Sequence, residues 1–253
     1  MQRVSIRPCA PEGLFRVGEV SQDHDRISAS MDVGRWATGA DGRPAVGALG
    51  VLADTVVGYA LMASLDPGSW SISTEIWIDV VGPIPTEGTL IAAAVPVQDG
   101  SFARGRISTR SGRPVAECRQ RGRYVEMPEG EPTDPDALVV PELHDARSLL
   151  GGDGAPDRST LEVTPFLLNP RGMLHGGVSL AVSELLATHS RVQHGSRLPT
   201  TSVHIVHTRG VPVGARVELE VVHRHTGRTL WVTDVAGTVD GRLCTAARVT
   251  AQS

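Results

Sequence analysis

Two long, almost uniformly apolar segments constrain this chain most, because each contains a single charged residue. Asp54 is the only charge within residues 44–65, and Glu184 is the only charge within residues 172–190. A helix that is apolar on nearly every face must be buried. The two segments therefore predict two buried helices, each of which carries one acid into the interior. A membrane span is a poor alternative for the first, since Asp54 at its centre would cost roughly 2.5–3.5 kcal/mol.

The surroundings of the two acids repeat along the chain. Asp54 and Glu184 lie 130 residues apart, and at this spacing residues 30–54 align over 160–184 without a gap. The agreement lies in the apolar positions rather than in identity, and it predicts one structural unit present twice. We expect an N-terminal unit at 1–125 and a C-terminal unit at 158–253, joined by a Pro- and Gly-rich linker at 126–157.

Both units have the same expected order of elements. A short strand and a Gly-rich turn precede each long helix, and segments rich in Val, Ile and Thr with DG and TG turns indicate an antiparallel meander after it. The predicted fold class is α+β, with a buried helix wrapped by an antiparallel sheet in each unit. The linker has one expected short helix, within 141–151. The predicted long helices are 47–64 and 177–194, and the predicted strands are 71–81, 89–98, 101–110, 113–125, 200–208, 215–224, 229–239 and 242–251.

Composition argues against several classes of partner. The formal net charge of −4 offers no basic surface for nucleic acid. Cys9, Cys118 and Cys244 are odd in number and far apart, which fits a reducing compartment better than a disulfide framework. The first residues lack the apolar stretch of a secretory signal. We therefore expect a cytoplasmic protein with neither nucleic acid nor membrane as a partner.

Chemistry is expected where the second helix begins. His175-Gly176-Gly177 directly precedes this helix, and Asn169 lies six residues before the histidine. Glycines at a helix start let a substrate approach the backbone, whose free N–H groups and helix dipole can polarise a carbonyl oxygen. The alternative is a turn that only leads into the helix, with His175 as its cap. For the two acids, the alternative is a structural carboxylate satisfied by backbone N–H groups or by an arginine.

Together these residues form the pattern N-x5-HGG-x6-[DE], which resembles hotdog-fold acyl-CoA thioesterases of the phenylacetate-degradation type. The resemblance covers nearly all of the second unit and, more faintly, the first. It implies a tandem double-hotdog chain that pairs its own two units as an intramolecular pseudo-dimer. It also implies hydrolysis of an acyl-CoA substrate without a metal or an organic cofactor, and it leaves open a homodimer of such pseudo-dimers.

That family builds its active site across two units, one supplying the acid and the other the glycine N–H and the asparagine. The resemblance therefore places Asp54 opposite Gly176 and Asn169, with His175 holding the turn and Gly177 beside the substrate. The family also has a hydroxyl on the strand after the helix. Ser202 fits this position in the second unit, and Thr74, with Ser73 or Glu75 as alternatives, fits it in the first.

The reciprocal site, where Glu184 would be the catalytic acid, is incomplete. Gly39 stands in place of the asparagine, and Ala45-Val46-Gly47 stands in place of the HGG motif. A valine in the position of the first motif glycine narrows the approach to the backbone. We therefore expect one working site in each chain.

Two other functions remain open at this stage. A hotdog hydratase or dehydratase would need an Asp/His couple. The only crude candidate is Glu184 with His189, whose side chains point in directions about 140° apart around a helix. A non-catalytic acyl-CoA-binding protein would keep a pocket without turnover. No metal site is expected, because His204 and His207 face opposite sides of a strand and His223 has no evident third ligand.

Overall fold

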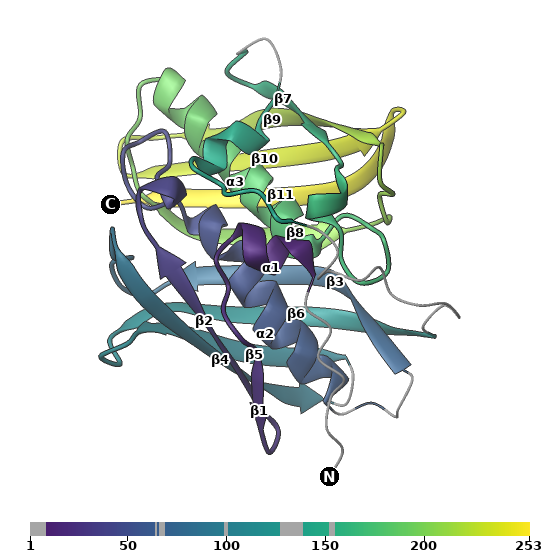
Figure 1. Ribbon diagram of the computed structural model, residues 1–253. Helices are drawn as coiled ribbons and strands as arrows, with labels where there is room; N and C mark the ends of the chain where they lie inside the picture. The colour runs from purple at the N-terminus through teal and green to yellow at the C-terminus, as the bar shows by residue number, and fades with distance from the viewer. Residues whose placement is uncertain (1–8, 64, 66–68, 99–100, 127–138, 152–154) are drawn as a thin grey trace.

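A computed structural model describes residues 9–63, 65, 69–98, 101–126, 139–151 and 155–253. Eleven strands form one antiparallel sheet in the order β1-β2-β4-β5-β6-β3-β8-β11-β10-β9-β7 (Figure 1). The strands are β1 (Ser21–Asp23), β2 (Arg26–Val33), β3 (Ser69–Val80), β4 (Gly88–Gln98), β5 (Phe102–Thr109), β6 (Pro114–Glu126), β7 (Arg158–Glu162), β8 (Thr200–His207), β9 (Arg216–Thr226), β10 (Leu230–Val239) and β11 (Arg242–Gln252). All eight strands that the sequence predicts after the long helices are confirmed, with each end within two residues.

Strand order is the same in the two halves of the sheet. From the outside inward, one half runs β2-β4-β5-β6-β3 and the other runs β7-β9-β10-β11-β8. The halves join where β3 pairs with β8, from Glu75 opposite Val206 to Asp79 opposite Ser202. This central pairing makes one continuous sheet out of two similar meanders.

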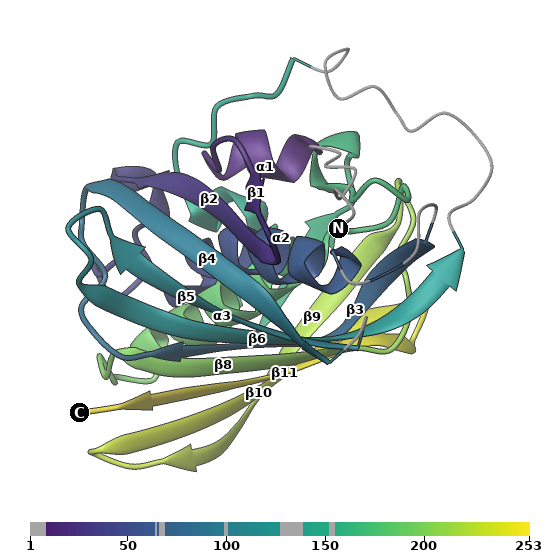
Figure 2. The ribbon, with the colours of Figure 1, turned by 90° about the horizontal axis from the view of Figure 1, so that it is seen from below.

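The two long helices, α2 (Gly50–Met62) and α3 (Gly176–Gln193), lie on the same side of the curved sheet (Figure 2). Helix α2 packs on β2 to β6, whereas α3 packs on β7 to β11, and the two helices contact each other. Nearly every residue of both helices is buried, as their composition predicts. No helix in the described part of the chain combines the length and apolar character needed to cross a membrane.

The two helices begin differently. His175 caps α3, because its Nδ1 accepts a hydrogen bond from the Gly177 N–H at 3.1 Å. No side chain caps the equivalent position before α2, and the chain enters through a 3₁₀ turn at Val46–Leu49. The helix predicted from residue 47 is therefore α-helical only from Gly50.

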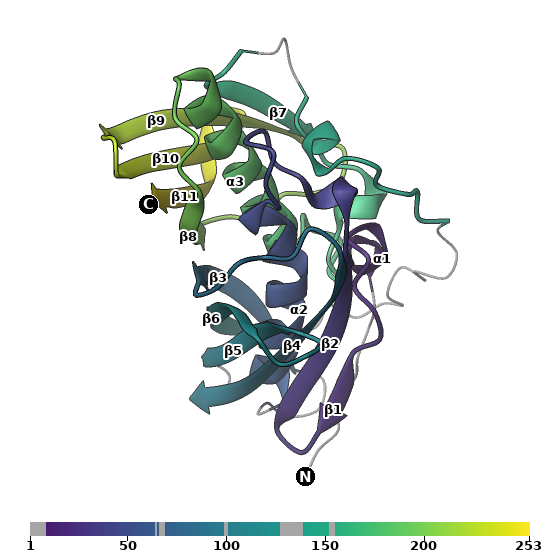
Figure 3. The same ribbon diagram turned by 90° about the vertical axis from the view of Figure 1, so that its left-hand side faces the viewer.

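The expected linker is described only in part, since residues 127–138 and 152–154 lie outside the described residues. The helix predicted within 141–151 is wrong in type, because this stretch forms a single 3₁₀ turn at Ala146–Leu149, capped by Asp145. Leu143 and Ala146 are buried in the main core. This segment packs near the short helix α1 (Ala10–Leu14), which in turn contacts α2 (Figure 3).

Glycines allow the starts of the two long helices to touch. A Cβ on Gly177 would lie 2.5 Å from the Gly50 carbonyl oxygen and 2.6 Å from the Val51 Cα. A Cβ on Gly47 would lie 2.7 Å from the Ala181 carbonyl oxygen. The Gly177–Val51 and Gly47–Ala181 contacts are related by the 130-residue spacing of the sequence repeat. Only glycine permits this approach at either position.

We predict that Gly177→Ala lowers the free energy of unfolding by about 2 kcal/mol, because the new methyl group would overlap backbone atoms that cannot move independently. Urea denaturation measures the change. Gly34→Ala is the control, since its backbone is extended and its nearest neighbour would be 3.7 Å away. Equal stability of the two variants would contradict this account of the helix contact.

Candidate active site

Asp54, near the start of α2, meets the first turn of α3. Its Oδ2 accepts a hydrogen bond from the Gly177 N–H at 2.7 Å and lies 3.1 Å from His175 Nδ1. Both side chains are largely buried, with 11% exposure for Asp54 and 7% for His175. The described residues offer no hydrogen bond to Oδ1 of Asp54. One carboxylate oxygen is therefore fixed, and the other is available.

Gly176 faces this acid without a side chain between them. A Cβ at Gly176 would lie 2.6 Å from Ser73 Oγ and 2.8 Å from Asp54 Oδ2, so any larger residue here would displace these side chains. Within the described chain, its N–H makes no hydrogen bond. This N–H lies at the positive end of α3 and can donate to a ligand.

Asn169 lies beside Gly176 in a turn that its own side chain stabilises. Its Oδ1 accepts hydrogen bonds from the backbone N–H groups of Arg171, at 2.9 Å, and Met173, at 3.2 Å. Because both partners are donors, the amide orientation is set, and Nδ2 is left without a partner among described residues. Asn169 can thus donate one hydrogen bond to a ligand near Gly176.

Two cavities meet at this point. A small cavity of about 70 Å³ runs along α2 from Asp54 toward Met62, and its walls include Trp70. A larger cavity of about 400 Å³ begins at Gly176 and extends past His207 toward Arg209. Both cavities are lined by Ile72, Ser73, Asn169 and Gly176. The free Gly176 N–H therefore lies at the junction of two spaces.

The structure brings Asp54, Asn169, His175 and Gly176 together, but it places three other candidate residues differently. Thr74 lines the larger cavity, although its hydroxyl donates to the Arg121 carbonyl oxygen at 3.2 Å. Gly177 lines neither cavity and instead holds Asp54. Ser202 also lines neither and pairs with Asp79 in the centre of the sheet.

His207, at the end of β8, is a site residue that the sequence analysis set aside. It lines the larger cavity, and its Cε1 would be 3.2 Å from a Cβ on Gly176. Although the residue is partly exposed as a whole, both ring nitrogens are buried; they make no hydrogen bond of standard geometry among the described residues, but the backbone groups of Gly176 and Ser73 lie close enough to favour the protonated ring. Burial lowers the pKa of His207, and the charge of Asp54 opposes this shift in part. The three-residue spacing between His204 and His207 predicts that their rings lie on opposite faces of the strand. It does not tell which of the two rings faces a cavity.

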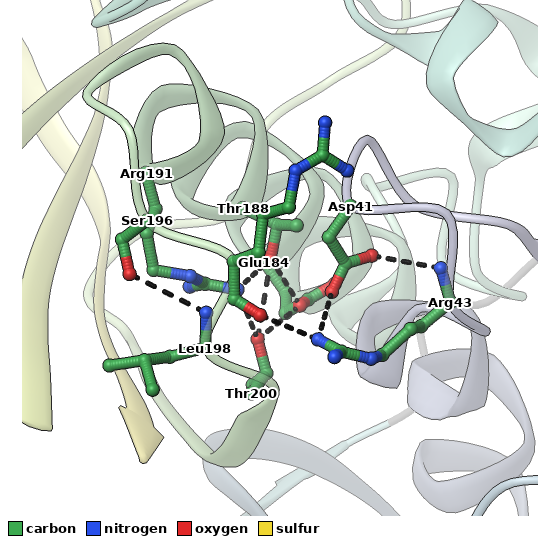
Figure 4. Close-up of polar contacts among 9 residues, drawn as sticks. Asp41, Arg43, Glu184, Thr188, Arg191, Ser196, Leu198 and Thr200 are labelled. Atoms are coloured by element: carbon green, nitrogen blue, oxygen red, sulfur yellow. Dashed lines mark hydrogen bonds and ion pairs between the residues drawn. The ribbon is translucent and has the colours of Figure 1, made fainter. Parts of the chain in front are cut away.

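Glu184 has a different environment from that of Asp54. Its Oε2 accepts a hydrogen bond from the Gly47 N–H at 3.0 Å, which is the contact between Gly177 and Asp54 shifted by 130 residues. Its Oε1 accepts hydrogen bonds from the Thr188 and Thr200 hydroxyls, both at 2.7 Å (Figure 4). Glu184 is 1% exposed and lines neither of the two cavities.

A buried arginine completes this second acid site. Arg191 donates to the Thr188 and Thr200 hydroxyls at 3.1 and 3.2 Å, so these hydroxyls connect it to Glu184 (Figure 4). Burial lowers the pKa of Arg191, and the negative charge of Glu184 opposes that shift. The arrangement resembles the structural alternative for a buried acid, although one backbone N–H and two hydroxyls satisfy the carboxylate and the arginine acts through those hydroxyls.

Two groups of three described residues bring potential metal ligands within 4.8 Å of one another. Cys9, Glu12 and His175 form the first, next to the small cavity. Burial, assisted by the charge of Glu12, raises the pKa of the Cys9 thiol well above its usual value, so the thiol stays protonated. The Cys9 N–H and the Thr55 hydroxyl both donate to Glu12. Hydrogen bonds within the protein therefore account for this group.

The second group corrects one expectation, because His223 does have neighbouring ligand atoms, from His194 and Asp157. They come from the end of α3 and from the residue before β7, so strand periodicity could not reveal them. Trp231 Nε1 donates to His223 Nδ1 at 2.9 Å, which leaves the ring proton on Nε2. His223 therefore presents a proton rather than a lone pair to the group, and the absence of a metal site stays a prediction.

Comparison with solved structures identifies the architecture. The acyl-CoA thioesterase II of Mycobacterium marinum superposes with a TM-score of 0.60 at 14% identity, over 95% of this chain and 96% of that one. A conserved protein of unknown function with a hotdog fold, from Alicyclobacillus acidocaldarius, gives 0.61 at 13% identity, over 98% and 99%. This chain has the hotdog fold. The 12:0-ACP thioesterase of Umbellularia californica is also similar, with a TM-score of 0.59 at 9% identity, over 89% and 93%. The sequence matches no protein-family model.

The lowered pKa of His207 predicts a pH-dependent loss of stability. The folded chain resists protonation of this ring, whereas the unfolded chain takes up the proton below about pH 6.5. Stability should therefore fall as the pH drops below about 6.5. Urea denaturation at pH 7.5 and 5.5 should show a smaller loss for His207→Gln than for wild type. His204→Gln is the control, and an unchanged loss in His207→Gln would contradict the prediction.

The Glu184 network predicts a second stability effect. Glu184→Gln removes the larger of the two negative charges that act on the buried Arg191, the other being that of Asp41, and should lower the free energy of unfolding by about 3 kcal/mol. Glu218→Gln, on an exposed position of β9, is a matched control and should change stability little. Urea denaturation at neutral pH tests both. A network of no structural importance would make the two variants indistinguishable.

Proposed function

We propose that this chain is a tandem double-hotdog acyl-CoA thioesterase. Its units, 1–125 and 158–253, would form an intramolecular pseudo-dimer across β3 and β8, with 126–157 as the connection. The repeated strand order and the helix contacts related by 130 residues support this organisation. Hotdog neighbours that are named acyl-CoA or acyl-ACP thioesterases support the reaction class. The HGG pattern favours the phenylacetate-degradation type among them.

One observation carries the proposal: Asp54 from one half meets the free Gly176 N–H of the other half at the junction of two cavities. A thioester with its carbonyl at this junction would extend its acyl group into one cavity and its CoA group into the other. Arg171 and the exposed Arg209 lie around the larger cavity, where guanidinium groups suit the phosphates of CoA. The small cavity would then receive the acyl group.

The proposed chemistry uses groups that the protein fold has already positioned. The thioester carbonyl oxygen accepts a hydrogen bond from the Gly176 N–H, which stabilises the oxyanion as it develops. Asp54 Oδ1 either takes a proton from the attacking water or attacks the carbonyl itself. The C–S bond then breaks, and the CoA thiolate leaves and takes up a proton. Where Asp54 itself attacks, water then hydrolyses the acyl–Asp54 anhydride, which releases the carboxylic acid and restores the Asp54 carboxylate. Asn169 orients the water or the carbonyl, and His175 maintains the glycine turn.

We propose one working site in each chain, because the Glu184 carboxylate already has its full set of protein partners. Neither a metal nor an organic cofactor takes part in this proposal. The protein would act in the cytoplasm on acyl-CoA substrates, with no nucleic-acid or membrane partner, and as a single chain or a homodimer of pseudo-dimers.

A hotdog hydratase is the second candidate, and one observation favours keeping it. Asp54 and His175 lie 3.1 Å apart beside the cavity, which is a better Asp/His couple than Glu184 with His189. In a hydratase this couple would add water across a conjugated double bond and leave the thioester intact. Loss of enoyl absorbance from crotonyl-CoA without thiol release would identify that reaction. An acyl-CoA-binding protein would show neither change.

We predict that Asp54→Asn lowers thiol release from acyl-CoA substrates by about 10²–10⁴-fold, because the amide neither accepts the proton nor attacks the carbonyl. Binding of a non-hydrolysable acyl-CoA thioether, measured by calorimetry, should change little. Glu184→Gln is the matched control and should keep most turnover per folded molecule. An active Asp54→Asn beside an inactive Glu184→Gln would make Glu184 the catalytic acid and refute the assignment.

A further inference from the structure

Two buried polar atoms at the small cavity, Ser71 Oγ and Gln120 Oε1, have no hydrogen-bond partner within the described chain. Their residues are 7% and 2% exposed, on the neighbouring strands β3 and β6. A buried polar atom without a partner destabilises the protein unless water or a ligand completes its hydrogen bonding. These two atoms therefore indicate that something polar occupies the cavity.

The unpartnered amide lies close to the proposed catalytic acid. A Cβ on Gly58 of α2 would be 3.6 Å from Gln120 Nε2 and 3.9 Å from Asp54 Oδ1. The Gln120 amide and the free carboxylate oxygen thus flank the same point above α2. A substrate group that reaches Gln120 would be only a few bonds from the reacting carbonyl.

Ser71 is kept at the cavity by a neighbouring glycine. A Cβ at Gly122, on β6, would overlap the Ser71 hydroxyl and also lie 2.7 Å from Leu61 Cδ1. The cavity therefore has an apolar part, which includes Met62 and Trp70, and a polar part formed by Ser71 and Gln120. Pockets for plain hydrocarbon chains do not need such polar groups, whereas a few placed polar groups orient a substituted ligand.

We infer that the acyl group carries a hydroxyl close to the thioester, as in a short hydroxyacyl-CoA; this inference rests on the proposed function. A hydroxyl can donate to Gln120 Oε1 and can also accept a hydrogen bond, so it suits either orientation of the amide. A carboxylate would be repelled by Asp54 and Glu12 around the same cavity. An ammonium group would have to give up the hydration of a full charge on entering a cavity of about 70 Å³, which costs more than burying a neutral hydroxyl.

Thiol release from butanoyl-CoA, 2-hydroxybutanoyl-CoA and 3-hydroxybutanoyl-CoA tests the inference. For wild type, we expect kcat/KM for one hydroxylated ester to exceed that for butanoyl-CoA by at least about tenfold, because binding the unsubstituted ester leaves buried polar groups unpaired. Gln120→Met and Ser71→Ala should each reduce this preference by slowing the hydroxylated ester more than butanoyl-CoA. Gln193→Met, at the exposed end of α3, should leave the preference unchanged.

Calorimetric binding of the same three esters separates this inference from the proposed function. If wild type hydrolyses none of them but binds a hydroxylated ester more tightly, and Gln120→Met loses that difference, the specificity stands and the thioesterase proposal fails. If butanoyl-CoA equals or exceeds both hydroxylated esters in hydrolysis and in binding, the inference is overturned. Bound water would then be what satisfies Ser71 and Gln120. Ser71→Ala keeps the test decisive should Gln120→Met fold poorly.

Discussion

Each long helix of this protein begins against the buried acid of the other, and the rest of the structure depends on this exchange. Gly177 donates its N–H to Asp54, and Gly47 donates its N–H to Glu184. Because an unpaired buried carboxylate is costly, each acid requires the opposite half of the sheet. The missing side chains at the two glycines let the helix backbones touch, and β3 with β8 completes the same junction.

The same contact has two chemical outcomes. Asp54 is held through Oδ2 alone, so Oδ1 faces a cavity beside the free Gly176 N–H. Glu184 is held through both oxygens, because Gly47 donates to Oε2 while Thr188 and Thr200 donate to Oε1 and link the acid to Arg191. Two hydroxyls and one arginine thus separate a candidate catalytic acid from a structural one.

The candidate site combines fixed and open hydrogen-bonding groups. Asp54 and Asn169 each use one polar atom to hold the protein together and keep the other for a ligand. Ser71 Oγ and Gln120 Oε1, in the wall of the small cavity, have no partner among the described residues. Partners for these two atoms must come from water or from a ligand.

The sequence by itself determined the elements and their duplication. Apolar runs, alternation along strands and the Asn169–His175 motif are local patterns, and the structure confirms both long helices and the eight strands that follow them. The two acids and the glycine turn were also evident, since a charge in an apolar run is conspicuous. A cap at His175 was one of two roles that the sequence left open for this residue, and the structure shows that it caps α3.

Only the tertiary structure decided which groups face a ligand. The register of β3 against β6 shifts between Ser73 and Glu75, and this bulge places Ser73 rather than Thr74 against Gly176. The sequence gives no sign that His207, Ser71 and Gln120 differ from ordinary strand residues. Their own segments contain no information about the space that α2 and α3 leave beside them. Thr200, on β8, reaches Glu184 on α3. Such contacts join residues far apart in the chain, and periodicity carries no information about them.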